Sequence, residues 1–101
     1  MKKMFLVVYR YYLEEKIQAL LAGLGVTTFS EAPKLLGVGE AGKVQDTHIW
    51  PGHNSCIFAV LPDQEIDRLV RAFNEFSKKH EEEIGKPAPL RAFLLPCEQV
   101  V

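Results

Sequence analysis

Two histidines and a cysteine stand close together in the middle of this 101-residue chain. His48 and His53 are five residues apart, and Cys56 follows His53 by three. Imidazole nitrogen and thiolate sulfur are good ligands for Zn(II), Cu(II) and Ni(II). The spacing matches no established zinc motif, so two solvated histidines and a buried strand cysteine remain the simpler interpretation. A divalent transition-metal site is therefore one hypothesis that these residues offer.

The only tryptophan, Trp50, lies between the two histidines. Indole is largely apolar but carries one hydrogen-bond donor. Trp50 can therefore anchor its segment on a neighbouring subunit, or it can present a surface on which a partner protein docks. Both interpretations stay open, and Trp50 is the partner-docking residue that the sequence offers.

The chain shows no catalytic pattern. No residue set has the spacing of a catalytic nucleophile and its base. No pair of carboxylates flanked by glycine or histidine suggests acid–base catalysis either. We therefore expect a protein that is not an enzyme, with a small ferredoxin-like enzyme, its site assembled only in three dimensions, as an alternative. The formal net charge is −1, and no basic stripe accompanies the aromatic residues, which argues against a nucleic-acid partner.

Length and composition predict a single globular domain over residues 1–101. Hydrophobic residues make up 48% of the chain and charged residues 25%, as is usual for globular proteins. No apolar run approaches the roughly 20 residues of a membrane helix, and the first apolar run is too short for a signal peptide. Two cysteines do not make a disulfide framework. We expect a cytoplasmic protein.

Three elements are predicted before the middle of the chain. Residues 4–9 form a continuous apolar run, which predicts a strand buried on both faces. A helix is predicted next, and Gly23 or Gly25 can end it in a left-handed conformation. Residues 26–36 are typical of an extended segment, and Pro33 indicates an edge strand or a bulge because proline removes a ladder donor. The helix itself is marked by apolar residues at helical spacing: Leu13, Ile17, Leu20, Leu21 and Leu24.

Three further elements follow the middle of the chain. Residues 55–61 form a second apolar strand, and Asp63 is a candidate N-cap for the next helix. Residues 84–89 contain a glycine and two prolines and must form a loop, after which residues 90–95 form the last strand. The second helix is marked by Ile66, Leu69, Val70, Phe73 and Phe76 and ends in the charged residues 77–83.

The predicted order βαββαβ is the ferredoxin-like arrangement of the α+β class. It places the strands of an antiparallel sheet in the order 4-1-3-2, with both helices on one face. The other face would then expose an apolar patch, which soluble monomers seldom do, so we expect a closed, symmetric oligomer. The connection over residues 37–54 is long for a compact domain, and its middle is expected to form a small hairpin or to be mobile.

Five segments carry a resemblance to a known family: the helix over 13–20, the turn over 24–27, and the segments 34–39, 60–63 and 84–86. Their sequences are Leu-Glu-Glu-Lys-Ile-Gln-Ala-Leu, Leu-Gly-Val-Thr, Lys-Leu-Leu-Gly-Val-Gly, Val-Leu-Pro-Asp and Ile-Gly-Lys. Together they resemble the PII-like superfamily, the trimeric signalling proteins best known from nitrogen regulation, in a short and divergent form. Residues 37–54 are similar to that family's T-loop, and residues 84–86 stand where it carries its B-loop.

The resemblance implies a homotrimer that binds a small effector, typically an adenine nucleotide, in clefts between subunits. Glycines would let backbone N–H groups approach an anion, and lysine or arginine would supply charge. Pro87 and Pro89 depart from the glycine-rich B-loop of the family. The effector-binding residues that the resemblance assigns are Gly37, Val38, Gly39, Gly85, Lys86 and Arg91.

The resemblance also implies a regulated partner, such as a membrane transporter or an efflux component, that responds to the T-loop-like segment. Some PII-like branches are linked to heavy-metal efflux systems, which connects the resemblance to the metal hypothesis. A metal-binding accessory protein that uses His48, His53 and Cys56 is accordingly the second functional interpretation.

Overall fold

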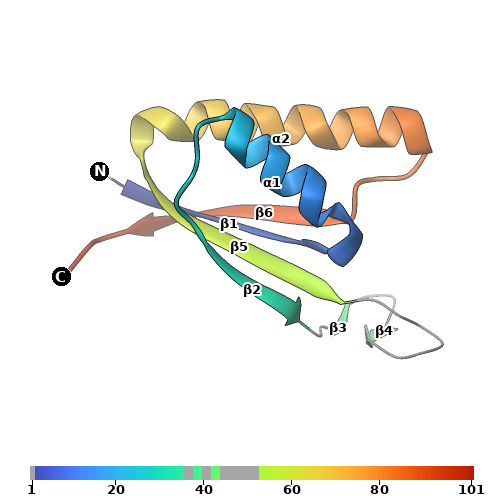
Figure 1. Ribbon diagram of the computed structural model, residues 1–101, viewed down its shortest axis with the longest axis horizontal. Helices are drawn as coiled ribbons and strands as arrows, with labels where there is room; N and C mark the ends of the chain where they lie inside the picture. The colour runs from blue at the N-terminus through green and yellow to red at the C-terminus, as the bar shows by residue number, and fades with distance from the viewer. Residues whose placement is uncertain (1, 36–37, 40–41, 44–52) are drawn as a thin grey trace.

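The computed structural model describes residues 2–35, 38–39, 42–43 and 53–101. Four strands form one antiparallel sheet in the order β2-β5-β1-β6, and both helices lie on the same side of it (Figure 1). This confirms the predicted ferredoxin-like α+β arrangement. The elements are β1 (Lys2–Arg10), the 3-10 turn η1 (Tyr11–Leu13), α1 (Glu14–Gly23), β2 (Ser30–Leu35), β3 (Val38–Gly39), β4 (Gly42–Lys43), β5 (Asn54–Pro62), α2 (Asp63–Ile84) and β6 (Leu90–Cys97).

The hydrophobic core lies between the sheet and the two helices. Alternate residues of β1, namely Phe5, Val7 and Tyr9, are at most 2% exposed and face the helices. Phe73 of α2 packs on Phe5 with ring centroids 4.9 Å apart, a tilted geometry that aromatic rings favour. The helix residues in this cluster follow the predicted spacing: Leu13, Ile17, Leu21, Ile66, Leu69 and Phe73.

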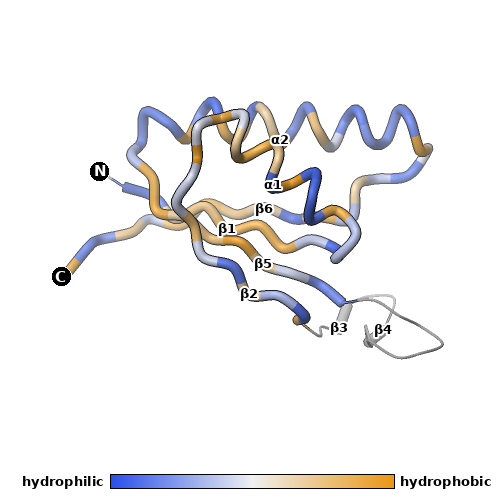
Figure 2. The backbone as a smooth tube through the Cα atoms, in the orientation of Figure 1, coloured by the Kyte–Doolittle hydropathy of each residue, from blue (hydrophilic) through white to orange (hydrophobic). Residues whose placement is uncertain are grey.

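The opposite side of the sheet, which we call the open face, is apolar but has no helix on it. Met4 and Leu6 of β1 are half-buried there, so the prediction that residues 4–9 are buried on both faces is wrong. Two helices can cover only one side of a four-stranded sheet. The cross-strand partners of Met4 and Leu6 complete the open face: Phe58 (36% exposed), Val60 (44%), Phe93 (51%) and Leu95 (43%). Figure 2 shows how hydrophobic β1 and β5 are along most of their length.

The ends of the helices differ from the prediction at one point. Pro62 occupies the N-cap position of α2 without a side-chain hydrogen bond, so the prediction that Asp63 caps this helix is wrong. Asp63 is instead the first helical residue, where its negative charge is favourable because the N-terminal end of the helix dipole is positive. Its carboxylate lies 4.0 Å from Lys3 Nζ. The helix ends at Ile84 and is capped by Gly85, whose φ of 83° is left-handed and whose N–H donates to the carbonyl of Glu81 at 2.8 Å. After α1, Gly25 takes the left-handed conformation with φ 79°.

Strand β2 is shorter and less regular than the predicted extended segment. It pairs with β5 in regular register from Ser30 to Ala32, and the register shifts before Leu35. Pro33 lies within this irregularity, as predicted, because it has no N–H to donate to the ladder. Beyond β2 the short strands β3 and β4 pair antiparallel with each other. Of the helices in the described part of the chain, neither is long and apolar enough to cross a membrane.

Candidate functional site

A cavity of about 680 Å³ lies at the end of the sheet where β1 finishes and where β5 and β6 begin. Its volume is in the range of small-ligand sites. Three segments far apart in sequence meet here because β1 lies between β5 and β6 in the sheet. Among the described residues the lining is Val8, Tyr9, Arg10, Asn54, Pro87, Ala88, Pro89, Leu90, Arg91 and Phe93.

Two arginines give the cavity its charge. Arg91 stands opposite Val8 in the β1–β6 register, and Arg10 follows Val8 by two residues. Side chains two residues apart in a strand point to the same face, so both guanidinium groups project from the open face as diagonal neighbours. Asn54 of β5 is the cross-strand partner of Arg10. The described lining contains no carboxylate, and this cavity is therefore suited to an anion, which guanidinium groups bind through paired hydrogen bonds.

Backbone hydrogen bonds fasten the walls of the cavity to one another. The N–H of Arg10 donates to the carbonyl of Pro89 at 3.1 Å, and the N–H of Tyr11 donates to the carbonyl of His53 at 2.9 Å. The prolines at 87 and 89 cannot donate backbone hydrogen bonds, but their fixed φ restricts the connection between α2 and β6. The cavity walls are thus held by β1 rather than by free loops.

Aromatic rings lie beside the cavity, at the end of β1. The ring of Tyr11 packs against the His53 ring with centroids 5.1 Å apart and planes tilted by 34°. The Arg10 guanidinium carbon lies 5.7 Å from the Tyr11 ring centroid, which is a cation–π distance. Tyr12 meets Tyr11 edge-on at 5.8 Å. This position offers flat aromatic surface next to the two cations.

The structure brings only part of the predicted effector-binding set to this cavity. Arg91 lines it, whereas Gly85 and Lys86 begin the same α2–β6 connection without lining it. The Lys86 carbonyl lies 3.2 Å from Nδ1 of His80 instead. Val38 and Gly39 form β3, and Gly37 lies outside the described residues. Two lining residues, Arg10 and Asn54, were not assigned to a site by the sequence analysis. The predicted strand order already places the end of the first strand beside the start of the last.

The predicted metal ligands are not gathered in the described part of the chain. His53 precedes β5 and packs on Tyr11, while Cys56 lies within β5 opposite Val8 and Ala32. Burial raises the pKa of the Cys56 thiol, which disfavours the thiolate that a metal requires. Among the described residues, no cluster of three or more His, Cys, Asp or Glu could hold a metal ion. His48 and Trp50 lie outside the described residues, so metal binding and docking through Trp50 stay predictions.

Comparison with known proteins finds no matching family model and no matching curated protein, but solved structures match. CPII, a nitrogen regulatory PII-like protein from Thiomonas intermedia K12, has a TM-score of 0.63 at 16% identity, covering 93% of this chain and 89% of that one. Arabidopsis thaliana PII has a TM-score of 0.67 at 13% identity, covering 96% and 78%. The chain has the PII-like fold. A DUF3240-family protein from Shewanella baltica OS155 is similar over 97% of this chain and 91% of its own, with a TM-score of 0.67 at 15% identity.

The PII-like fold agrees with the resemblance that the sequence carries from residue 13 to residue 86. Two of these similar structures hold small molecules: the Thiomonas protein is bound to ADP, AMP and bicarbonate, and the Arabidopsis protein is bound to citrate. Each of these molecules is an anion.

Proposed function

We propose that this protein is a PII-like signalling protein that binds an anionic effector, an adenine nucleotide, in the cavity lined by Arg10 and Arg91. The observation that carries this proposal is the pair of guanidinium groups on one face of the sheet, in a cavity whose described lining has no carboxylate. Phosphate oxygens are the acceptors that such a pair recognises best. The ligands of the Thiomonas and Arabidopsis proteins, all of them anions, support the same class of effector.

The residues around the arginines fit the rest of a nucleotide. The Tyr11 ring offers an aromatic face for a base, and the Asn54 side chain can donate and accept hydrogen bonds. We retain Lys86 as a second source of positive charge and Gly85, with Gly37, Val38 and Gly39, as backbone that an anion can approach. Arg10 and Asn54 join Arg91 in the proposed site.

The proposed assembly is a homotrimer in which the open faces of the sheets pack together. The open face exposes large apolar side chains in the middle of a sheet, and burying them would be favourable at about 25 cal/mol per Å². Phe93 belongs both to the open face and to the cavity lining. Packing at the open face would therefore bring a neighbouring subunit to the rim of the cavity, which supports an effector site between subunits.

In this proposal the effector acts on a partner through the T-loop-like segment, residues 37–54. That segment ends at Asn54, which lines the cavity, and the carbonyl of His53 accepts a hydrogen bond from Tyr11. An effector at Arg10 would thus contact the residues that fix one end of the segment. A cytoplasmic protein that regulates a membrane transporter or an efflux component is the corresponding cellular role.

A thermal-shift panel tests the proposed function. ADP, AMP, bicarbonate, Zn(II), Cu(II) and Ni(II) are each added to the purified protein. A ligand at a hundred times its Kd should stabilise the fold by about 2.7 kcal/mol, which raises the Tm of a domain of this size by about 10 °C or more. We expect ADP or AMP to raise the Tm. A shift with metals alone, lost when His48 and His53 are both replaced by alanine, would favour the metal-binding accessory protein instead.

A further inference from the structure

The ring of Tyr11 lies close to the Arg10 guanidinium group because the chain turns where β1 ends. Side chains of adjacent residues in a regular strand point to opposite faces. Arg10 is still extended, with φ −68° and ψ 143°, but Tyr11 begins the 3-10 turn η1. The guanidinium carbon of Arg10 lies 5.7 Å from the Tyr11 ring centroid. The turn therefore brings the cation within the range of a cation–π contact.

Tyr11 is itself held through both its backbone and its ring. Its N–H donates to the carbonyl of His53 at 2.9 Å, and the centroids of the Tyr11 and His53 rings are 5.1 Å apart. The edge-on ring of Tyr12 adds a contact at 5.8 Å. Tyr11 is 38% exposed, so the hydrophobic core alone does not fix its ring. These contacts at the end of β1 set the position of the ring.

The side chain of Arg10 is the part of this residue that its strand does not fix. Its backbone is fixed, because its N–H donates to the carbonyl of Pro89 at 3.1 Å and because it pairs with Asn54 of β5. A long arginine side chain has many rotamers, and a ligand that restricts them loses affinity. Arg10 lines the cavity in the same conformation in which it contacts Tyr11. The contact with the ring therefore favours the conformation that an anion would meet.

An aromatic ring is a suitable support for a cation that must remain able to bind an anion. A carboxylate would accept the guanidinium hydrogen bonds and would compete with an anionic effector. The face of a ring attracts the cation through its quadrupole and carries no net charge. Tyr11 can thus hold Arg10 without neutralising it.

We propose that Tyr11, held by His53, is a positioning residue that keeps the Arg10 guanidinium group at the wall of the effector cavity. This inference deepens the proposed function and rests on it, since it concerns the same site. It differs from the stacking of a nucleotide base on Tyr11, because it acts through Arg10 and needs no base. Binding of phosphate groups should therefore depend on an aromatic ring at residue 11.

Nuclear magnetic resonance of the Arg10 side chain tests the positioning in the absence of any effector. The ¹⁵N relaxation of Nε measures how ordered a guanidinium group is, and Arg71, an exposed residue of α2, is the reference. We expect Arg10 to be more ordered than Arg71 in the wild type and in Tyr11→Phe, which keeps the ring. In Tyr11→Leu the order of Arg10 should fall to that of Arg71. Equal order of Arg10 in the wild type and in Tyr11→Leu would overturn the proposal.

Calorimetric titration with ADP and with pyrophosphate, which has two phosphoryl groups but no base, tests what the positioning contributes to binding. Tyr11→Leu should weaken the binding of both ligands by the same factor, roughly two- to fivefold, which one exposed cation–π contact contributes. Tyr11→Phe should bind both ligands as the wild type does. A loss of affinity for ADP alone would assign Tyr11 to base stacking and would overturn the proposal.

Tyr12→Leu is the matched control, because it removes an aromatic side chain from the next position, which is 57% exposed. It should keep the wild-type order of Arg10 and the wild-type affinities. Equal losses in Tyr12→Leu and Tyr11→Leu would indicate a general loosening of the turn and would overturn the proposal.

Two further outcomes are also decisive. If Tyr11→Leu fails to fold, His53→Ala, which removes the support of the ring, takes its place: lower order at Arg10 supports the proposal, and unchanged order overturns it. A wild type in which Tyr11 orders Arg10 but which binds neither ADP nor pyrophosphate would contradict the proposed function and support the positioning of Arg10.

Discussion

At the scale of single residues, the guanidinium groups of Arg10 and Arg91 project from adjacent strands, so the sheet sets their spacing. The backbone of Arg10 is also bonded to Pro89 in the α2–β6 connection. Cations held in this way lose less conformational entropy when an anion binds than cations on free loops would. The two arginines should therefore dominate the affinity for a phosphate-bearing effector.

Arg91→Ala should weaken ADP binding roughly 10- to 100-fold, because a hydrogen bond to a charged group contributes about 1.5–3 kcal/mol. The ADP-induced rise in Tm reports this loss. Arg71→Ala, which removes an exposed arginine of α2, is the control and should bind ADP as the wild type does. Equal loss in both variants would mean that net charge, rather than the cavity, governs binding.

Glu31→Gln should raise the Tm near neutral pH. The folded state raises the pKa of Glu31, so the fold is favoured when this carboxyl is protonated, and that contribution is lost as pH rises through the raised pKa. The neutral amide removes the repulsion with Glu14. The gain should shrink as pH falls toward the ordinary pKa of glutamate, and a gain that is constant with pH would contradict this explanation.

At the scale of elements, the two helices are ended by glycines in different ways. Gly85 closes α2 with a φ of 83°, whereas Gly23 is the last residue of α1 and has no positive φ. A Cβ built on either glycine would meet nothing within 4 Å. Substitution by alanine therefore tests the backbone alone.

Gly85→Ala should destabilise the fold by about 1–2 kcal/mol, the cost of a left-handed conformation for a residue with a Cβ. Gly23→Ala should stabilise it by up to about 1 kcal/mol, because alanine loses less entropy in a helix. Urea denaturation of both variants measures these changes. The same sign in both variants would show that the φ of residue 85 is not what requires glycine.

The sequence predicted most helices and strands correctly, but it did not predict which side chains of neighbouring strands lie side by side. Apolar residues at helical spacing located both helices, because a helix buried on one side has this period. Apolar runs located three strands, but they did not reveal that one face of the sheet is left open. Asp63 was assigned as an N-cap because local rules favour aspartate there, but the chain leaves β5 so that Pro62 takes that position. Arg10 was missed because an arginine at a strand end carries no local signal. Its place in the proposed site follows from the cross-strand pairing of Val8, two residues before it, with Arg91.

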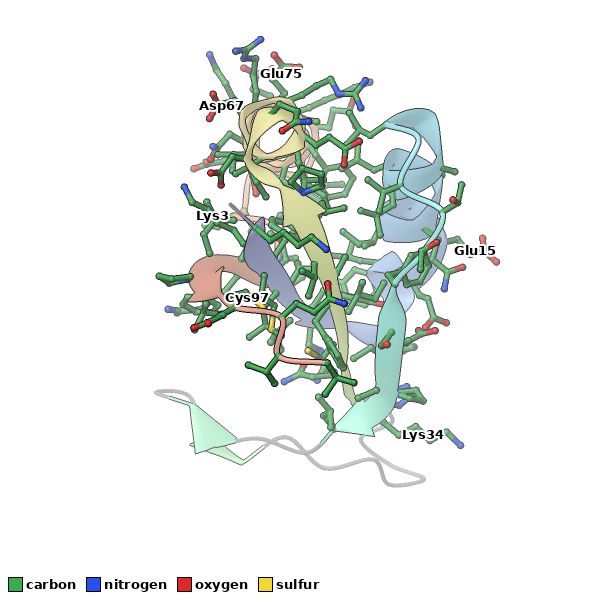
Figure 3. All side chains as sticks on the ribbon, turned by 90° about the vertical axis from the view of Figure 1, so that its left-hand side faces the viewer. Lys3, Glu15, Lys34, Asp67, Glu75 and Cys97 are labelled. Atoms are coloured by element: carbon green, nitrogen blue, oxygen red, sulfur yellow. The ribbon has the colours of Figure 1, made fainter. Side chains whose placement is uncertain are left out.

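At the scale of the whole molecule, the open face is the feature that most strongly indicates an interaction with another chain. One side of the sheet is covered by α1 and α2 (Figure 1), while the other exposes Phe58, Val60, Phe93 and Leu95. Patches of this kind on soluble proteins mark interaction sites. The outward side of α2 is charged instead, with Asp67 and Glu75 pointing away from the sheet (Figure 3), so the open face is the better candidate for subunit contact.

Val60→Glu should convert the proposed trimer to monomers, because it places a charge within the apolar open face. Light scattering at micromolar concentration measures the mass. Ile84→Glu is the matched control, since Ile84 is 62% exposed at the end of α2, and it should leave the oligomer intact. A wild-type protein that is monomeric at this concentration would contradict the proposed assembly.

Calorimetric titration of ADP into the wild type and into the double variant Arg10→Ala/Arg91→Ala tests the proposed effector site most directly. The account predicts one ADP bound per subunit in the wild type and no measurable binding in the double variant, with an unchanged oligomeric mass. Wild-type protein that binds neither ADP nor AMP, or a double variant that binds ADP as tightly as the wild type, would contradict it.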